Sequence, residues 1–242
     1  MLVYFATGGS MKKLSLVFAL LCATAWTTYA TNIGDDFHAH YSAGANLSAY
    51  NKDMSAMVGM IDFTSGGGRT FPAADLGVNV SIFKPSSDNT LSSDSYTVLP
   101  FLVATTKIPV IDVGVVARGT SISGYTSVGG GLTYQLQFFH TLNVSLGGFY
   151  DNGRTDWYTT DHYSLSAVAS ADILIFTPYL GIGYDYSKLQ TRGFEYNRST
   201  SDGQVRTMVG INASPIPFLS GFVAYTMTKD SHGFTGGMGL SF

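Results

Sequence analysis

The sequence has few charged residues, one cysteine and no long apolar run beyond its first 30 residues. Asp, Glu, Lys and Arg make up 12% of the 242 residues, against roughly 25% in soluble proteins. A single cysteine excludes a disulfide within the chain. The lack of an apolar stretch of about 18 or more residues argues against transmembrane helices. The net charge of −3 gives no basic surface that would indicate nucleic-acid binding.

Glycine and aromatic residues are abundant instead, with 28 Gly, 15 Tyr and 16 Phe. Hydrophobic residues make up 45% of the chain, which is enough for a water-soluble core, so a soluble β-sandwich is one candidate fold. A chain that is poor in charge and rich in Gly and aromatics, without long apolar runs, is more typical of a membrane β-barrel.

The N-terminal residues predict a secretory signal peptide at residues 11–30. Lys12 and Lys13 form its basic start, and the apolar stretch that follows is too short to span a membrane as a helix. Residues 1–10 are interpreted as an over-called start. Removing these segments leaves 11 basic and 16 acidic residues, a net charge of −5, and also removes Cys22.

Apolar and polar residues alternate along most of residues 73–242, which we take as the barrel. This period of two predicts strands with one apolar face. A segment at 96–105 is weaker because Pro100 interrupts it. The clear segments are 75–83, 110–119, 127–136, 141–150, 163–173, 176–187, 204–213, 218–227 and 233–242. The predicted fold is all-β, a transmembrane antiparallel up-and-down β-barrel of 10–12 strands.

Charged residues test the assignment of faces independently. Six of them lie in these segments, each with the parity opposite to the apolar row: Asp75, Asp112, Arg118, Asp172, Asp185 and Arg206. We expect all six to face the lumen, because a shift of one residue would turn every side chain to the other face. The preferred interpretation is that they pair with one another and lock the interior. An ion-selective constriction is the alternative.

The lengths of the connections favour an outer-membrane topology, in which periplasmic turns are short and extracellular loops are long. The predicted periplasmic turns are brief: 106–109, 137–140, 174–175 and 214–217. The predicted extracellular loops are longer and polar, apart from the last: 84–95, 151–161, 189–203 and 229–232.

The final strand resembles the C-terminal assembly signal of bacterial outer-membrane barrel proteins. Phe234, Leu240 and the terminal Phe242 share its apolar row. The segments "TPYLGIGYDYS" and "LPFLVATTKIPVIDVGVVARG" also resemble a family of uncharacterised outer-membrane barrels. The resemblance implies recognition by the barrel-assembly machinery and location in the bacterial outer membrane, in contact with its lipid and lipopolysaccharide. It implies no known activity.

Residues 31–72 allow two interpretations. Residues 37–49 alternate strictly and 57–63 could form a return strand, which would bring the barrel to 12 strands, the number slightly favoured. Alternatively, residues 36–52 form an amphipathic helix that plugs a 10-stranded barrel, with Phe37 and Leu47 on its apolar side.

Three lysines have outward parity: Lys84, Lys188 and Lys229. Each lies at the extracellular end of a strand. A lysine in that position can lay its stem on the apolar belt and raise its ammonium group to the headgroups. We hypothesise that the three contact lipopolysaccharide phosphates. Solvation at the rim is the competing interpretation.

No pattern predicts catalysis, a cofactor or a metal site. Asp161 next to His162 is the best catalytic candidate, but neighbours in a strand point to opposite faces, so Asp161 cannot orient the imidazole. His38 and His40 would share a face of a strand, but no third ligand lies near them. The remaining candidates are interpreted as solvated loop residues: Asp156, Asp230 and His232.

Three functions remain open from the sequence. The first is a structural barrel or a narrow, porin-like passive channel for small solutes. The second is surface adhesion through loops 151–161 and 189–203, whose aromatic residues could dock a partner: Trp157, Tyr158, Phe194 and Tyr196. The least favoured is a barrel enzyme that acts on lipid or peptide.

Overall fold

The computed structural model describes residues 33–63, 74–92, 96–108, 111, 113–122, 124–138, 141–216 and 218–241. The predicted signal peptide, the predicted start, Asp112 and Phe242 lie outside these residues. What the sequence suggests for them stays a prediction.

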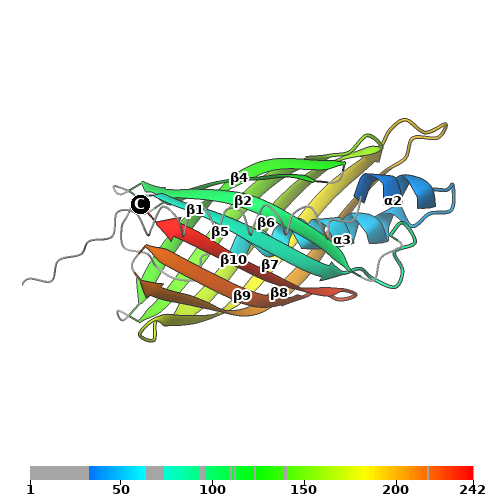
Figure 1. Cartoon of the computed structure of the whole chain (residues 1–242). Coiled ribbons are helices and arrows are strands. Elements are labelled where there is room, and N and C mark those ends of the chain that lie inside the picture. Colours follow the sequence, from blue (N-terminus) through cyan, green and yellow to red (C-terminus); the bar gives the residue numbers. More distant parts are fainter. Residues whose placement is uncertain are drawn as a thin grey trace, which may run out of the picture.

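Ten strands of the described chain form one closed antiparallel barrel (Figure 1). Each strand pairs with its neighbours in sequence, and β10 pairs with β1 from Asp75 opposite Ser241 to Lys84 opposite His232. Every described strand therefore has a partner on both sides, which a bilayer requires because unpaired backbone groups are costly in lipid. The strands are β1 Ala74–Lys84, β2 Thr97–Ile108, β3 Val113–Ile122, β4 Tyr125–Phe138, β5 Leu142–Arg154, β6 Tyr158–Ala171, β7 Phe176–Thr191, β8 Ser199–Ile216, β9 Leu219–Met227 and β10 His232–Ser241.

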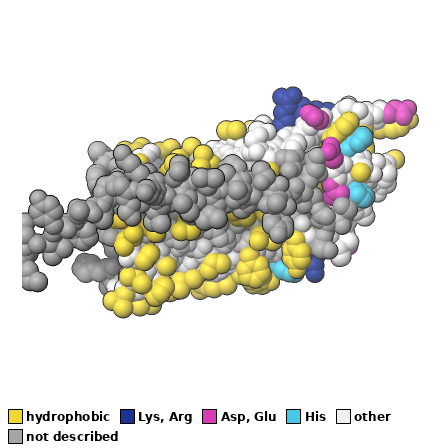
Figure 2. Space-filling model, in the orientation of Figure 1, with side chains coloured by type: hydrophobic (Ala, Val, Ile, Leu, Met, Phe, Trp, Pro, Cys, Tyr) yellow, Lys and Arg dark blue, Asp and Glu magenta, His cyan; other side chains and the backbone are white. Residues whose placement is uncertain are grey.

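The two faces of the wall differ in chemistry. Leu132, Leu165 and Leu180 point outward and are 58%, 67% and 65% exposed, whereas Ser164 and Ser166 point inward and are buried. Figure 2 shows hydrophobic side chains over the part of the barrel away from the helices, and charged side chains mainly at the helical end. An apolar exterior over a polar interior suits a barrel in lipid. The predicted fold class is confirmed.

Strands β5 to β8 extend further than the sequence suggested. Residues 151–161 and 189–203 were expected to be loops, but only 155–157 and 192–198 connect the strands there. Strands β7 and β8 have 16 and 18 residues, against about 9–11 needed to cross a bilayer. Their ends pass beyond the apolar belt, where outward positions can be polar, so the sequence pattern that marks a strand in lipid fades.

Two helices and a 3₁₀ turn replace the two extra strands, so the favoured count of 12 strands is wrong. They are α2 (Ile33–His40), α3 (Leu47–Gly59) and η1 (Met60–Phe63). The side chain of Asn46 caps α3 by accepting a hydrogen bond from the Ala49 amide at 3.2 Å. The alanines at alternate positions of residues 37–49, which suggested one face of a strand, are also the strongest helix formers. None of the helices in the described part of the chain is long and apolar enough to cross a membrane.

These helical residues, 33–63, form a plug in one end of the barrel. Helix α3 lies inside the wall and α2 lies at the mouth (Figure 1). Eleven of the 13 residues of α3 are buried, and its contacts with the wall are mainly to β7 and β8. The main hydrophobic cluster of the protein joins the plug to the wall, with Phe37, Tyr50 and Met57 on one side and Phe101 and Leu189 on the other.

Strand β2 shows how the plug shapes the sequence. Its inward residues Leu99, Phe101 and Val103 are apolar and buried, while Leu102 faces outward and is 47% exposed. Both faces of this strand are apolar because one meets the plug and the other meets lipid. The alternation that identifies the other strands is therefore weak here, and Pro100 is accommodated opposite Val80 of β1.

Removing a plug-facing side chain should destabilise the protein more than removing the neighbouring lipid-facing one. Phe101→Ala opens a cavity against the plug, and we expect a loss of about 3–5 kcal/mol in the free energy of unfolding. Leu102→Ala is the matched control and should lose far less, because its side chain is exposed. Urea unfolding in detergent micelles measures both. Equal losses would contradict the packing of the plug against β2.

Candidate functional site

Six ionisable side chains meet inside the barrel where the plug ends. Five come from inward positions of the wall and one from η1: Arg118 of β3, Asp151 of β5, His162 of β6, Asp185 of β7, Arg206 of β8 and Asp62 of η1. We call this set the ionic ring. All six are buried, with exposures between 0% and 7%.

Asp62 joins two arginines from opposite sides of the wall. Arg118 donates from Nη1 to Asp62 Oδ1 at 2.6 Å, and Arg206 donates from Nη2 to Asp62 Oδ2. Ser164 Oγ also donates to Oδ2, at 2.5 Å. In the strand order, β3 and β8 are five strands apart in either direction. The contact through Asp62 therefore crosses the full width of the lumen.

The rest of the ring follows the wall from β3 to β8. Arg118 donates from both Nε and Nη2 to Asp151, with the Nε bond at 2.7 Å, which is the bidentate geometry of strong pairs. His162 lies between two carboxylates, with Nδ1 3.3 Å from Asp151 Oδ2 and Nε2 3.2 Å from Asp185 Oδ1. Arg206 Nε donates to Asp185 Oδ2 at 2.6 Å. The chain of contacts thus closes on itself.

The charges of the ring balance when the imidazole is protonated. Ionised carboxylates only accept hydrogen bonds, so both nitrogens of His162 must donate to satisfy Asp151 and Asp185, which requires the cation. Three carboxylates then face two guanidinium groups and one imidazolium. Balance matters here because a buried charge without a partner is strongly destabilising.

A glycine of α3 and an aromatic side chain of the wall lie directly against the ionic ring. A Cβ at Gly59, the last residue of α3, would lie 2.5 Å from Asp185 Oδ1 and 2.6 Å from Arg206 Nε. The missing side chain therefore lets the helix end rest directly on the ring. On the other side, the Arg118 guanidinium lies 4.7 Å from the ring centre of Phe149, in the range of a cation–π contact.

The six residues predicted from parity occupy different places. Arg118, Asp185 and Arg206 lie in the ring, whereas Asp75 and Asp172 lie at the other end of the barrel. Asp75 accepts from Ser241 Oγ, and Asp172 accepts from Asn143 Nδ2 at 2.8 Å. Asp112 is outside the described residues.

Sequence reasoning missed three members of the ring. Asp151 was placed in a loop and His162, weighed as a catalytic candidate, at a loop edge, but both continue the inward parity of their strands by one position beyond 141–150 and 163–173. Extending the rows would have found both. Asp62 was placed in a strand, and no strand periodicity could have located a residue that η1 carries.

The other candidate residues form no catalytic or metal arrangement among the residues described. Asp161 faces outward and accepts from Tyr150 at 2.8 Å, while its neighbour His162 faces inward. His40 lies beside Asp36, at 3.2 Å, and His38 stacks on Trp157. In the described part of the chain, no three His, Cys, Asp or Glu residues are grouped to hold a metal ion.

The loop aromatics hold the plug at the mouth of the barrel. The rings of Tyr158 and Phe194 lie 4.7 and 6.2 Å from the ring of Phe37 in α2. Trp157 stacks on His38 at 3.7 Å, and its other neighbours include the backbone of Gly193, whose φ is +78°. Tyr196 is the exception, with 69% of its surface exposed.

Polar contacts fasten one side of α3 to β7 and β8. Asn51 donates to the Ser187 carbonyl at 3.1 Å and to Asp202 Oδ2 at 3.0 Å. Ser187 Oγ donates back to Asn51 Oδ1 at 2.8 Å, and Ser48 Oγ donates to Asp202 Oδ1 at 2.5 Å. The plug is thus held by hydrogen bonds on this side and by apolar packing on the side of β2.

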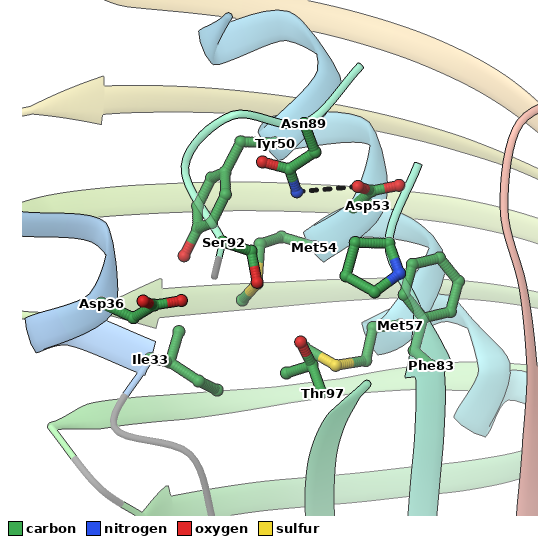
Figure 3. Close-up of a pocket in the computed structure, with 11 residues that line it drawn as sticks. Ile33, Asp36, Tyr50, Asp53, Met54, Met57, Phe83, Asn89, Ser92 and Thr97 are labelled. Atoms are coloured by element: carbon green, nitrogen blue, oxygen red, sulfur yellow. Dashed lines mark hydrogen bonds between the residues drawn. The ribbon is translucent and has the colours of Figure 1, made fainter. Parts of the chain in front are cut away.

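Asp53 joins the plug to the loop between β1 and β2. Its Oδ2 accepts from the Ser86 amide at 2.9 Å. It also accepts from Asn89 Nδ2 at 2.8 Å, the hydrogen bond drawn in Figure 3. A cavity of about 20 Å³ lies beside it, with Asp36 on its lining, and is large enough for about one water molecule. Burial raises the pKa of Asp53 to about 6, a shift to which Asp230 contributes and which the hydrogen bonds oppose.

This shift predicts that the folded protein is more stable in acid. The pKa of Asp53 is higher in the folded protein than in the unfolded chain, so folding takes up a proton between about pH 4 and 6. The stabilisation is complete at low pH and is lost as the pH rises through 6. We expect a larger free energy of unfolding at pH 5 than at pH 7.5, measured by urea unfolding in detergent micelles. Asp53→Asn should reduce the difference; an unchanged difference would contradict this role.

Comparisons with known proteins show a distant likeness in structure only. No protein-family model matches the chain, and no curated protein matches it by sequence. Among solved structures, it is similar to the translocator domain of the autotransporter NalP from Neisseria meningitidis, with a TM-score of 0.46, 10% identity and coverage of 81% of this chain and 100% of that chain. The KdgM porin in complex with disordered oligogalacturonate has a TM-score of 0.42 and 9% identity, with coverage of 69% of this chain and 99% of that chain. Ail, the attachment invasion locus protein of Yersinia pestis, has a TM-score of 0.35 and 14% identity, with coverage of 69% of this chain and 93% of that chain. No function is drawn from likenesses at this level.

Proposed function

We propose that this protein is an integral outer-membrane channel for small polar solutes that its own N-terminal plug holds closed. The single observation that carries the proposal is the contact through Asp62, which ties a separate segment of chain to opposite sides of the lumen. The apolar exterior supports the location in a membrane, and the plug supports a closed state.

The end of the lumen away from the plug supports a path for polar solutes. Inward residues of β2, β4 and β5 near this end are polar and keep part of their surface accessible: Thr105, Lys107, Thr133, Gln135 and Ser145. A barrel that is only structural can fill its interior with packed side chains. Accessible polar groups are instead what lines a passage for water and small solutes.

The way in which the plug is held supports release rather than permanent filling. Its inner end and one side are fastened by ion pairs and hydrogen bonds to wall residues such as Arg118 and Ser187. Water that enters on opening can solvate these polar and charged groups, whereas a fully apolar plug would expose only apolar surface on release. The plug and the ring are therefore suited to a closed state that can open.

The adhesion alternative loses most of the residues on which it depended. Three of the four loop aromatics, Trp157, Tyr158 and Phe194, pack against α2 instead of projecting from the surface. Tyr196 alone remains exposed. No arrangement of the described side chains favours the enzyme alternative, because the imidazole of His162 is held between two carboxylates and not beside a nucleophile.

Conductance in planar bilayers tests the proposal. The wild-type barrel should conduct little, and a variant that lacks residues 33–63 should conduct steadily. Heat-modifiable migration in gels checks that both are folded. A structural barrel would stay silent in both forms, and an open wild-type pore of equal conductance would show that the plug does not close the lumen.

A tethered variant supplies the matched control. Ser48 and Asp202 are in hydrogen-bond contact across the plug and the wall, so Ser48→Cys with Asp202→Cys places two thiols at this contact, and the predicted mature chain has no other cysteine. Any brief openings of the wild type should disappear in the oxidised variant and return on reduction. Openings that persist with the disulfide formed would contradict gating by the plug.

A further inference from the structure

The three outward lysines do not share one environment. Lys84 is the last residue of β1 and pairs in register with His232, the first residue of β10. Lys229 lies in the turn that leads from β9 into β10. The side chains of Lys84, Lys229 and His232 therefore gather at one place on the rim, and we call these three residues the rim patch. Lys188 lies on β7, opposite Asp161 of β6 in register.

No ion pair is found for Lys84 or Lys229 among the described residues. The nearest acid in sequence, Asp230, lines a cavity on the plug side together with Asp53, and Lys229 does not. The rim patch thus presents positive charge to the outside with no described acidic partner. Lys188 also has no ion pair among the described residues, but the outward carboxylate of Asp161 lies opposite it in register.

An apolar shelf lies directly below the rim patch on the outer face. Tyr225 and Phe234 are register partners with ring centres 4.8 Å apart, and Phe234 is 53% exposed. The ring of His232 lies 6.0 Å from that of Tyr225. Figure 2 shows a histidine and a basic side chain beside hydrophobic side chains at the border of the apolar belt. Aromatic side chains in such positions mark the level of lipid headgroups.

We propose that the rim patch binds the phosphate of lipid A in the outer leaflet, and that an acyl chain of the lipid lies along Tyr225 and Phe234. The lysine stems lie on the shelf while their ammonium groups donate to phosphate oxygens, and His232 donates a further hydrogen bond. Charge above and apolar surface below match one amphiphilic molecule. The inference rests on the proposed membrane location and is independent of the plug.

The test compares the rim patch with Lys188. Purified barrels are mixed with diphosphorylated lipid A, and bound lipid is measured by native mass spectrometry. The variant Lys84→Gln, Lys229→Gln should bind about 20-fold more weakly, from the attraction lost at two cations. Lys188→Gln is the matched control and should bind like the wild type. Retention of lipid by the double variant, or an equal loss in the control, would overturn the proposal.

Two further arms identify the ligand chemistry. Lipid A without its phosphates should bind weakly to the wild type, because the lysines then have no anion to contact. Equal binding of this lipid would show that the shelf alone is responsible. Inorganic phosphate at millimolar concentration should not displace the lipid, and displacement would reassign the patch to free anions. Conductance enters none of these readouts, so they stand apart from the test of the channel.

Discussion

The attachment of the plug across the lumen depends on one carboxylate. Asp62 accepts hydrogen bonds from Arg118 and Arg206, which stand on strands five places apart in either direction around the wall. No other described residue of the plug carries charge into the ring. Removing Asp62 would leave only two carboxylates, Asp151 and Asp185, to balance two guanidinium groups and one imidazolium, and a buried excess of charge is costly. The position of η1, and with it the inner end of α3, follows from this requirement.

The other contacts of the plug with the wall are partly polar and partly apolar. The wall provides a polar interior because its apolar rows are committed to the outside, so a plug can bind there only if it supplies complementary polar groups, as Asn51 and Asp62 do. Apolar packing joins the plug to β2 and, at the mouth, places Phe37 among the loop aromatics. Gly59 allows the backbone itself to reach the ring. The plug across the lumen and the apolar exterior are the features on which the proposed channel rests.

The sequence predicted the barrel well because lipid imposes a simple rule. Outward residues such as Leu165 must be apolar, so a period of two appears in nearly every strand, and the opposite parity placed Arg118, Asp185 and Arg206 in segments that do become strands. The period of two is lost where the outward face does not meet lipid or the inward face is not polar. Strand β2 meets the plug, residues 151–161 pass beyond the apolar belt, and the alanines of residues 37–49 suit either a helix or a strand. Asp62 could not be placed, because its partners are distant in sequence and only the folded barrel brings them together.

The coupling energy between Asp62 and Arg206 is the most direct measure of how firmly the ionic ring holds the plug. A double-mutant cycle compares the unfolding free energies of Asp62→Ala, Arg206→Ala and the double variant in detergent micelles. If the pair fastens the plug across the lumen, the coupling should reach about 2–3 kcal/mol, at the upper end for residues in direct contact. Additive losses, with a coupling near zero, would show that Asp62 does not hold the plug to the wall.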